Sequence, residues 1–85
     1  MAAYRLFFKE SVQKDLAGIP KKDLRKILGS IKSLAADPRP PGYEKLTGQD
    51  RYRLRQGRYR IVYAVQDEER TVTIVKVGHR KDIYR

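Results

Sequence analysis

The sequence predicts an α+β fold in which two helices pack on one face of a four-stranded sheet. Two observations lead to it: apolar residues recur every three or four positions over residues 9–36, and they alternate with polar residues from position 51 onward. The expected order is an opening strand, a two-helix hairpin and an antiparallel three-stranded meander whose last strand covers residues 71–77. With 85 residues, the chain is expected to form one domain, 1–85.

The first half of the chain supplies the edge of the sheet and the helices. Residues 3–8 alternate in the manner of a short edge strand, and residues 9–18 form a short helix. Pro20 suits the first turn of a longer amphipathic helix, which should end before Asp37 because a proline follows. Residues 37–50 are rich in proline and glycine and are predicted to form a loop.

An arginine-rich hairpin is predicted for residues 51–65, with a tight turn near Gly57. The residues expected to face the core are Tyr52, Leu54, Tyr59, Ile61, Tyr63 and Val65. Because successive strand residues point to opposite faces, Arg53, Arg55 and Arg60 should then share the other, open face. The sequence thus predicts a basic sheet surface opposite the helices.

Composition restricts the partners. Twenty Lys and Arg against ten Asp and Glu give a net charge of +10, which favours nucleic acid, an acidic membrane surface or an acidic protein as partner. The chain has no cysteine and a single histidine, His79, so neither a zinc site nor a cofactor is expected. Without a long apolar run, a cytoplasmic protein that does not enter the membrane is expected.

Arginines held on a sheet suit a phosphodiester, because each guanidinium offers forked donors and keeps its charge. Such cations are suited to cleaving RNA without metal, where the 2′-oxygen attacks phosphorus and charge builds on the phosphate oxygens. A nearby aromatic residue would stack on an unpaired base, and Tyr84, with Arg80 four residues before it, is the natural candidate. From the pattern alone, simple polyanion binding or edge protection is favoured over catalysis.

Several segments of the chain resemble the RelE/ParE toxins of bacterial and archaeal toxin–antitoxin pairs. These segments are residues 34–39 (LAADPR), 45–48 (KLTG), 52–55 (YRLR), 57–63 (GRYRIVY) and 77–84 (VGHRKDIY). Each is weak alone, but their order and spacing are specific. The resemblance implies the RelE-like form of the α+β fold over the whole chain.

RelE-like members of this family are ribosome-dependent endoribonucleases that cut messenger RNA in the A site by 2′-hydroxyl attack without metal. Position by position, the resemblance assigns Arg53, Arg55, Arg60 and Arg80 to the scissile phosphate and Tyr84 to the substrate base. ParE-like members share the fold, act on DNA gyrase and lack this constellation. The five residues therefore favour an endoribonuclease over a gyrase inhibitor, and over a basic module that only binds nucleic acid.

Two further expectations follow from the resemblance. Arginine is a very poor general base, so the proton transfers are left to Tyr84, His79 or Glu44, of which Glu44 lies in the predicted loop with no visible partner. The partners implied are the ribosome, messenger RNA and a small antitoxin that wraps the toxin. The net charge of +10 favours an acidic antitoxin. The free toxin is expected to be a monomer, and its complex with the antitoxin a hetero-oligomer.

Overall fold

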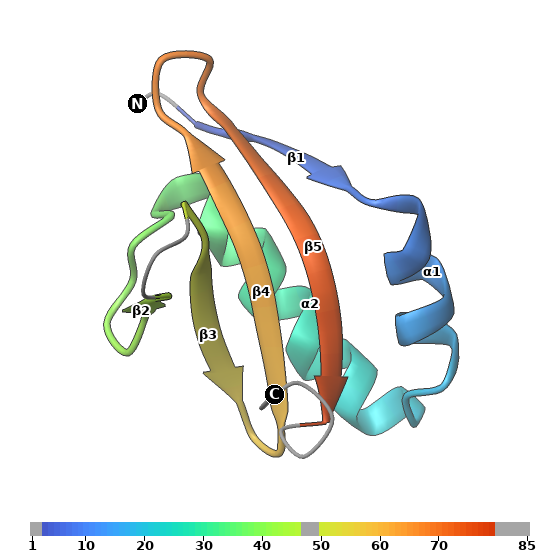
Figure 1. Ribbon diagram of the computed structural model, residues 1–85. Coiled ribbons are helices and arrows are strands. Elements are labelled where there is room, and N and C mark those ends of the chain that lie inside the picture. Colours follow the sequence, from blue (N-terminus) through green and yellow to red (C-terminus); the bar gives the residue numbers. More distant parts are fainter. Residues whose placement is uncertain (1–2, 47–49, 80–85) are drawn as a thin grey trace.

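A computed structural model describes residues 3–46 and 50–79 and confirms the α+β class (Figure 1). The elements are β1 (Arg5–Phe8), α1 (Glu10–Ala17), α2 (Lys21–Ala36), β2 (Glu44–Lys45), β3 (Tyr52–Gln56), β4 (Tyr59–Gln66) and β5 (Thr71–His79). The strands form one sheet in the order β1-β5-β4-β3-β2. The helical hairpin and the antiparallel meander of β3, β4 and β5 are as predicted.

The sheet has five strands, not the predicted four. The additional strand, β2, lies within residues 37–50, which were predicted to form a loop, and pairs Glu44 with Arg53 and Lys45 with Tyr52. Two residues are too few to show an alternating pattern in a sequence, so no local signal marks this strand.

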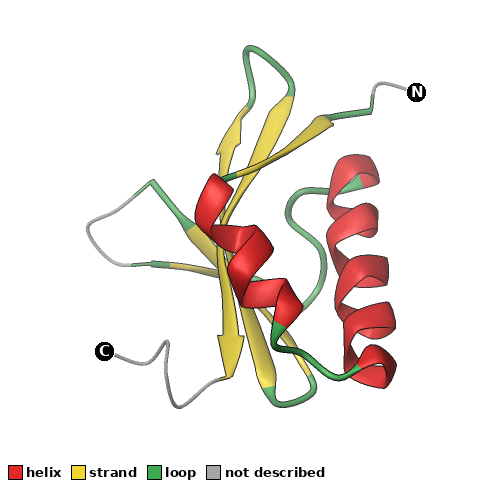
Figure 2. Cartoon of the chain, turned by 90° about the vertical axis from the view of Figure 1, so that its right-hand side faces the viewer, coloured by secondary structure: helices red, strands yellow, loops and turns green. Residues whose placement is uncertain are grey.

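The two helices hold the sheet differently. In Figure 1, α2 runs behind the sheet while α1 lies beside β5, beyond the point where β1 ends, and Figure 2 shows the two helices from the side. The parallel pairing of β1 with β5 stops at Phe8 and Ile74. Further along β5, the Val77 N–H donates to Asp15 Oδ2 at 3.1 Å, so a side chain of α1 replaces the missing strand there. No helix in the described ranges is long and apolar enough to cross a membrane.

The core lies between the helices and one face of the sheet. Its buried residues are Val12, Ile27, Ile31, Leu34, Leu54, Ile61, Tyr63, Val72, Ile74 and Val77. The predicted core face of the hairpin is confirmed, with Tyr52, Tyr59 and Val65 half-buried against this cluster. The Tyr63 hydroxyl donates to the Pro38 carbonyl at 2.7 Å, which satisfies its polar end and ties the segment after α2 to the sheet.

Two glycines should respond oppositely to alanine. A Cβ at Gly29, in the middle of α2, would meet nothing within 4 Å. We expect Gly29→Ala to raise the free energy of unfolding by about 1 kcal/mol, since alanine is the better helix former. Gly57, at the β3–β4 turn, has a φ of 59°, so Gly57→Ala should lower stability. Urea unfolding of both variants tests this, and a destabilised Gly29→Ala would contradict it.

Candidate functional site

The three arginines of the β3–β4 hairpin share one face of the sheet, as predicted. Arg55 lies directly opposite Arg60, and Arg53 lies opposite Val62. Side chains directly opposite each other have Cβ atoms about 5 Å apart, and diagonal neighbours about 7 to 8 Å. Arg53, Arg55 and Arg60 are therefore all close enough to contact one phosphate group or two consecutive ones.

The arginine face is less open than predicted. Arg55 is exposed, but Arg60 is only 2% exposed and Val62 8%. The position of β4 in the middle of the sheet accounts for Val62, because Arg53 and Lys76 flank it in register on the two neighbouring strands. The prediction of an open surface is wrong at these two positions, and Arg60 is instead held within the structure.

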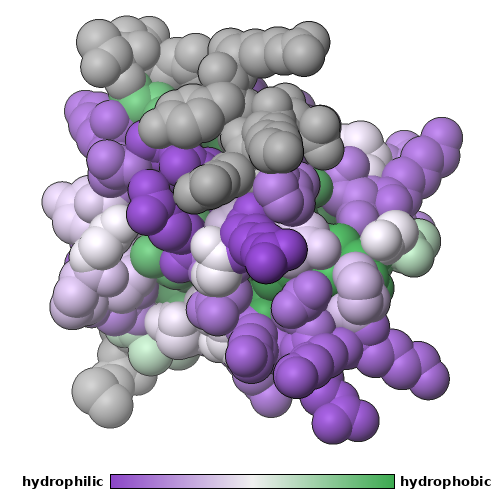
Figure 3. All heavy atoms as spheres, turned by 90° about the horizontal axis from the view of Figure 1, so that it is seen from below, coloured by the Kyte–Doolittle hydropathy of each residue, from purple (hydrophilic) through white to green (hydrophobic). Residues whose placement is uncertain are grey.

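This arrangement places like charges together. Arg55 and Arg60 are opposite each other in the ladder, and like charges so placed destabilise a sheet. Figure 3 views the end of the molecule where β3 turns into β4 and shows hydrophilic side chains over much of it. Three guanidinium groups on one face offer several forked donors to phosphate oxygens, so the arrangement suits a phosphate.

Glu44 also belongs to this site, although the sequence placed it in a loop with no visible partner. Its Oε1 accepts hydrogen bonds from Arg53 Nε at 3.1 Å and from a terminal guanidinium nitrogen at 2.6 Å. These bonds lower the pKa of the Glu44 carboxyl below its ordinary value. Because Glu44 is paired with Arg53 in register, its side chain lies on the arginine face. The two-residue strand β2 thus brings a carboxylate to the cations.

His79, the other described candidate for proton transfer, is on the opposite face. It pairs in register with Tyr59, whose ring it meets edge-on at 5.8 Å between centroids. Since Tyr59 packs against the core, the His79 side chain lies on the helix side of the sheet. No group of three or more His, Cys, Asp or Glu within residues 3–46 and 50–79 is placed to hold a metal. Arg80 and Tyr84 lie outside the described residues.

A second polar cluster, which no sequence pattern indicated, is built on Arg39. Its guanidinium donates to both carboxylate oxygens of Asp67, at 3.1 and 2.9 Å, and lies 5.2 Å from the centroid of the Tyr52 ring. The Tyr4 hydroxyl donates to the same carboxylate at 2.8 Å. The hydrogen bond from Arg39 lowers the pKa of Asp67. These residues are far apart in the chain, and their contacts secure the segment that leads to Glu44.

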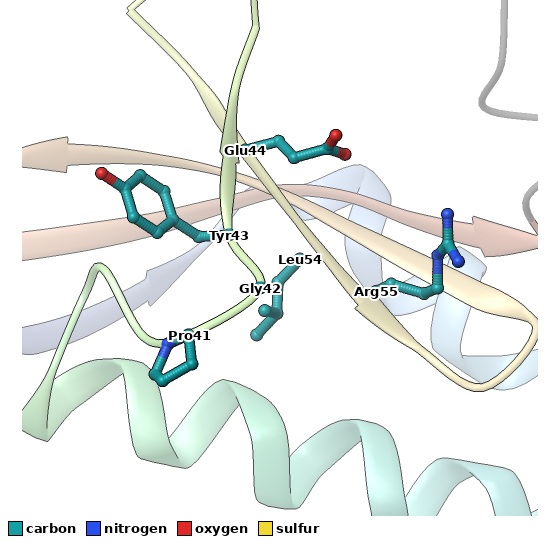
Figure 4. A pocket seen from close by; sticks show the side chains of 6 residues that line it. All are labelled: Pro41, Gly42, Tyr43, Glu44, Leu54 and Arg55. Carbon is teal, nitrogen blue, oxygen red and sulfur yellow. The ribbon is translucent and has the colours of Figure 1, made fainter.

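A hollow of about 470 Å³ opens beside the arginine face (Figure 4). It is lined by Pro41, Gly42, Tyr43, Glu44, Leu54 and Arg55. In Figure 4, Leu54 points toward α2 and Arg55 points the other way, so the hollow lies along the edge of β3. The hollow therefore joins the core side of the sheet to the arginine face.

Comparison with known proteins agrees with these features. Over residues 6–84, the sequence matches the family described as the ParE toxin of type II toxin-antitoxin system, parDE. It is also 33% identical to the toxin RelG of Mycobacterium tuberculosis, over 96% of this chain and 97% of that protein. The chain belongs to the RelE/ParE superfamily of type II toxins. A putative toxin RelE1 of Methanocaldococcus jannaschii is likewise 33% identical to this RelE/ParE toxin, over 87% of each chain.

Solved structures of RelE proteins share the fold of this RelE/ParE toxin. The archaeal RelE–RelB complex of Pyrococcus horikoshii contains a chain with a TM-score of 0.83 and 32% identity, covering 94% of this chain and 97% of that one. A chain of the intact RelBE toxin–antitoxin complex of E. coli has a TM-score of 0.77 and 31% identity, covering 91% of this chain and 96% of that one. The resemblance read from the sequence segments is thereby confirmed at the level of the superfamily.

Proposed function

We propose that this toxin is a RelE-type endoribonuclease that cuts messenger RNA in the ribosomal A site, without metal, and so inhibits translation. The observation that carries the proposal is the set of charges on one sheet face: Arg55 opposite Arg60, with Arg53 diagonal to Arg60 and bonded to Glu44. The RelE names of its relatives favour the same activity. Gyrase inhibition, suggested by the ParE description of the family, would not require a carboxylate beside the arginines.

The reaction is a transesterification within the RNA. The 2′-oxygen forms a bond to the adjacent phosphorus while the bond from phosphorus to the 5′-oxygen breaks, which leaves a 2′,3′-cyclic phosphate and a 5′-hydroxyl. Arg53, Arg55 and Arg60 hold the non-bridging oxygens, where negative charge grows in the transition state. Arg80 completes this set and Tyr84 stacks on the substrate base, as the family resemblance implies. The 2′-hydroxyl proton goes to a base, and the departing oxygen receives a proton from an acid.

Glu44 is the better placed of the described candidates for the base. It lies on the arginine face, whereas His79 lies on the other. The hydrogen bonds from Arg53 lower its pKa, which keeps the carboxylate ionised at neutral pH but also makes it a weaker base, so its position is the argument for this role. We expect Glu44→Gln to slow single-turnover cleavage about 10²-fold or more while messenger binding persists.

The pH dependence of cleavage is a second test of Glu44 as the base. A lowered pKa means that Glu44 remains ionised as the pH falls to its ordinary value of 4.5, so cleavage should decline only below that value. Glu69→Gln, in the exposed β4–β5 turn, is the matched control and should cut normally. Unchanged cleavage by Glu44→Gln would assign the base elsewhere, to Tyr84 first.

The partners follow from charge and from the relatives. The toxin is a monomer when free and is neutralised by an antitoxin in a hetero-oligomer. The RelE–RelB complexes of similar proteins support the antitoxin partner. With a net charge of +10, it favours an acidic antitoxin that covers the arginine face. Its targets, the ribosome and messenger RNA, place its action in the cytoplasm.

Primer extension on messenger from cells expressing the toxin tests the activity. Cuts placed in register with codons are expected. Intact messenger combined with arrested DNA supercoiling would instead favour a gyrase inhibitor. Intact messenger and normal supercoiling, with binding to RNA that falls steeply in salt, would leave a nucleic-acid-binding module.

A further inference from the structure

We propose that the outer face of α2 binds the phosphate backbone of a folded RNA, on the opposite side of the toxin from the arginine face. In Figure 2, α2 is the longer of the two helices and lies on the side of the molecule away from the sheet. The choice of RNA as the source of the phosphates rests on the proposed function. The inference adds a second RNA contact, which holds the toxin on its target and takes no part in the cleavage.

The exposed residues of α2 are basic or small, apart from one leucine. With 3.6 residues per turn, they all fall on one side of the helix, which is its outer face. They are Lys21, Lys22, Arg25, Lys26, Leu28, Gly29, Lys32, Ser33 and Ala36. Asp23, the acidic residue of α2, is half-buried and lies on the other side of the helix. The outer face therefore presents a row of positive charges that its own helix does not neutralise.

These charges do not stabilise the helix. Lys21 lies one turn before Arg25, and neighbours of like charge at this spacing destabilise a helix. Lys22 and Lys26 have the same spacing. Both Lys21 and Lys22 also lie in the first turn, where the helix dipole disfavours positive charge. Among the described residues, neither ion pair includes a side chain of α2, so its cations are available to an outside partner.

The outer face of α2 fits a row of phosphates. From Lys21 to Lys32 the helix rises about 16 Å, and a nucleic-acid duplex carries one phosphate for about every 1.7 Å of its axis. Gly29 lies between Arg25 and Lys32 on this face, and a Cβ placed there would meet nothing within 4 Å. This low point lets a nucleic-acid backbone come close to the helix. Lysine and arginine side chains then bind the phosphates without reading the base sequence.

Protein and lipid partners fit this face less well. The centre of a protein interface is usually rich in aromatic residues and poor in lysine, but of the exposed large apolar residues described only Leu28 belongs to α2. A helix that lies in a lipid surface needs a free apolar side. That side of α2, with Ile27, Ile31 and Leu34, is buried in the core. Charge and shape therefore favour the phosphates of an RNA.

Binding of a folded RNA that cannot be cut tests this face. The probe is a fluorescent RNA hairpin with 2′-O-methylated sugars, measured by anisotropy over a range of salt concentrations. The α2 variant, Lys22→Gln/Arg25→Gln/Lys26→Gln, should bind it about 10- to 100-fold more weakly at about 0.1 M salt. The slope of log affinity against log salt should fall by about 0.9 for each phosphate contact that is lost. Glutamine forms helices about as well as lysine and arginine, so the fold is kept.

A second triple variant controls for the loss of charge. Arg5→Gln/Lys9→Gln/Lys14→Gln removes the same charge from exposed positions before and on α1 and should bind nearly as tightly as the wild type. Equal affinity of the α2 variant and this control would overturn the docking face even if the toxin cuts messenger. If the wild type cuts no messenger but the α2 variant still binds the hairpin more weakly than the control, the docking face stands and the nuclease proposal fails.

Cleavage separates docking from chemistry. With saturating ribosomes, the α2 variant should cut messenger at the wild-type single-turnover rate, because the contact is equally strong in the ground and transition states. Half-maximal cleavage should require about 10- to 100-fold more ribosomes, in line with the weaker binding. A slower rate at saturation with unchanged half-maximal concentration would show that the face acts on the chemistry and would refute its role in docking.

Three other polyanions identify the occupant: a DNA hairpin of the same sequence, vesicles that contain phosphatidylserine, and a polyglutamate peptide. At equal concentrations of negative charge, the wild type should bind the RNA hairpin at least as tightly as the DNA hairpin. It should bind the RNA hairpin more tightly than the vesicles or the peptide. Tighter binding to any of the three, lost in the α2 variant, would replace RNA as the partner and refute the proposal.

Discussion

Arg60→Met should cut messenger about 10²- to 10³-fold more slowly than the wild type, the loss typical of removing one fixed group that stabilises transition-state charge. Arg60 has the largest expected effect on the hairpin because it is 2% exposed and lies opposite Arg55 in the sheet. A buried and fixed charge needs no reorganisation when the phosphate becomes more negative. Methionine fills similar space without charge, so the variant tests the charge and leaves the packing largely intact.

The rate is measured by single-turnover cleavage of messenger on programmed ribosomes, and stability by urea unfolding. Arg58→Ala, two residues earlier in the exposed turn, removes one positive charge and should cut at the wild-type rate. Arg60→Lys should fall between the wild type and Arg60→Met, because lysine keeps the charge and loses the forked donors. Wild-type cleavage by Arg60→Met would show that this guanidinium does not act on the phosphate, and the site would then rest on Arg53 and Arg55.

The hairpin was predictable because its signal is local. Arginines alternate with Tyr and Leu over residues 52–55 and with Tyr and Ile over residues 58–61, and a two-residue turn at Gly57 preserves the register between the strands. That pattern alone assigns each residue to a face. It predicted both the core side and the side on which Arg53, Arg55 and Arg60 meet.

How deeply each arginine of that face is buried was not predictable from the sequence. The pattern assigns Arg55 and Arg60 to the same side but carries no information on their neighbours in other strands, and one is exposed while the other is buried. The last strand shows the same limit, because a register shift between Val62 and Tyr63 changes which residues of β5 lie opposite β4. A bulge of this kind depends on how two strands fit together, which neither strand's sequence reveals.

Contacts between distant segments were also missed. Glu44 reaches Arg53 only because β2 forms, and Asp67 reaches Arg39 only because the β4–β5 turn closes over the segment after α2. Neither pair has a spacing that a sequence pattern would mark. The family resemblance predicted the arginines of the candidate site, but the carboxylate beside them came from the structure.

Arg80→Ala and Tyr84→Ala are each expected to abolish growth arrest while leaving the fold intact. Both positions come from the resemblance and lie outside the described residues, so this remains a prediction about function. The described part of β5 ends at His79, whose neighbour Gly78 lies opposite Arg60 in the ladder. Arg80, the next residue in the chain, therefore follows directly from the strand that borders the arginine face. Loss of a guanidinium there should slow cleavage about 10²- to 10³-fold.

Growth after induction, primer extension on the messenger and thermal unfolding followed by circular dichroism check this prediction together. Arg85→Ala, at the end of the same segment, is the control for loss of charge and should remain toxic. Tyr84→Phe separates two roles of the tyrosine: it keeps a ring for stacking on the base and removes the hydroxyl that would accept or donate a proton. A toxic Tyr84→Phe would therefore assign Tyr84 to stacking and leave Glu44 as the proton acceptor. If Arg80→Ala and Tyr84→Ala both stay fully toxic with intact folds, the tail takes no part, and the described hairpin with Glu44 must contain the whole site.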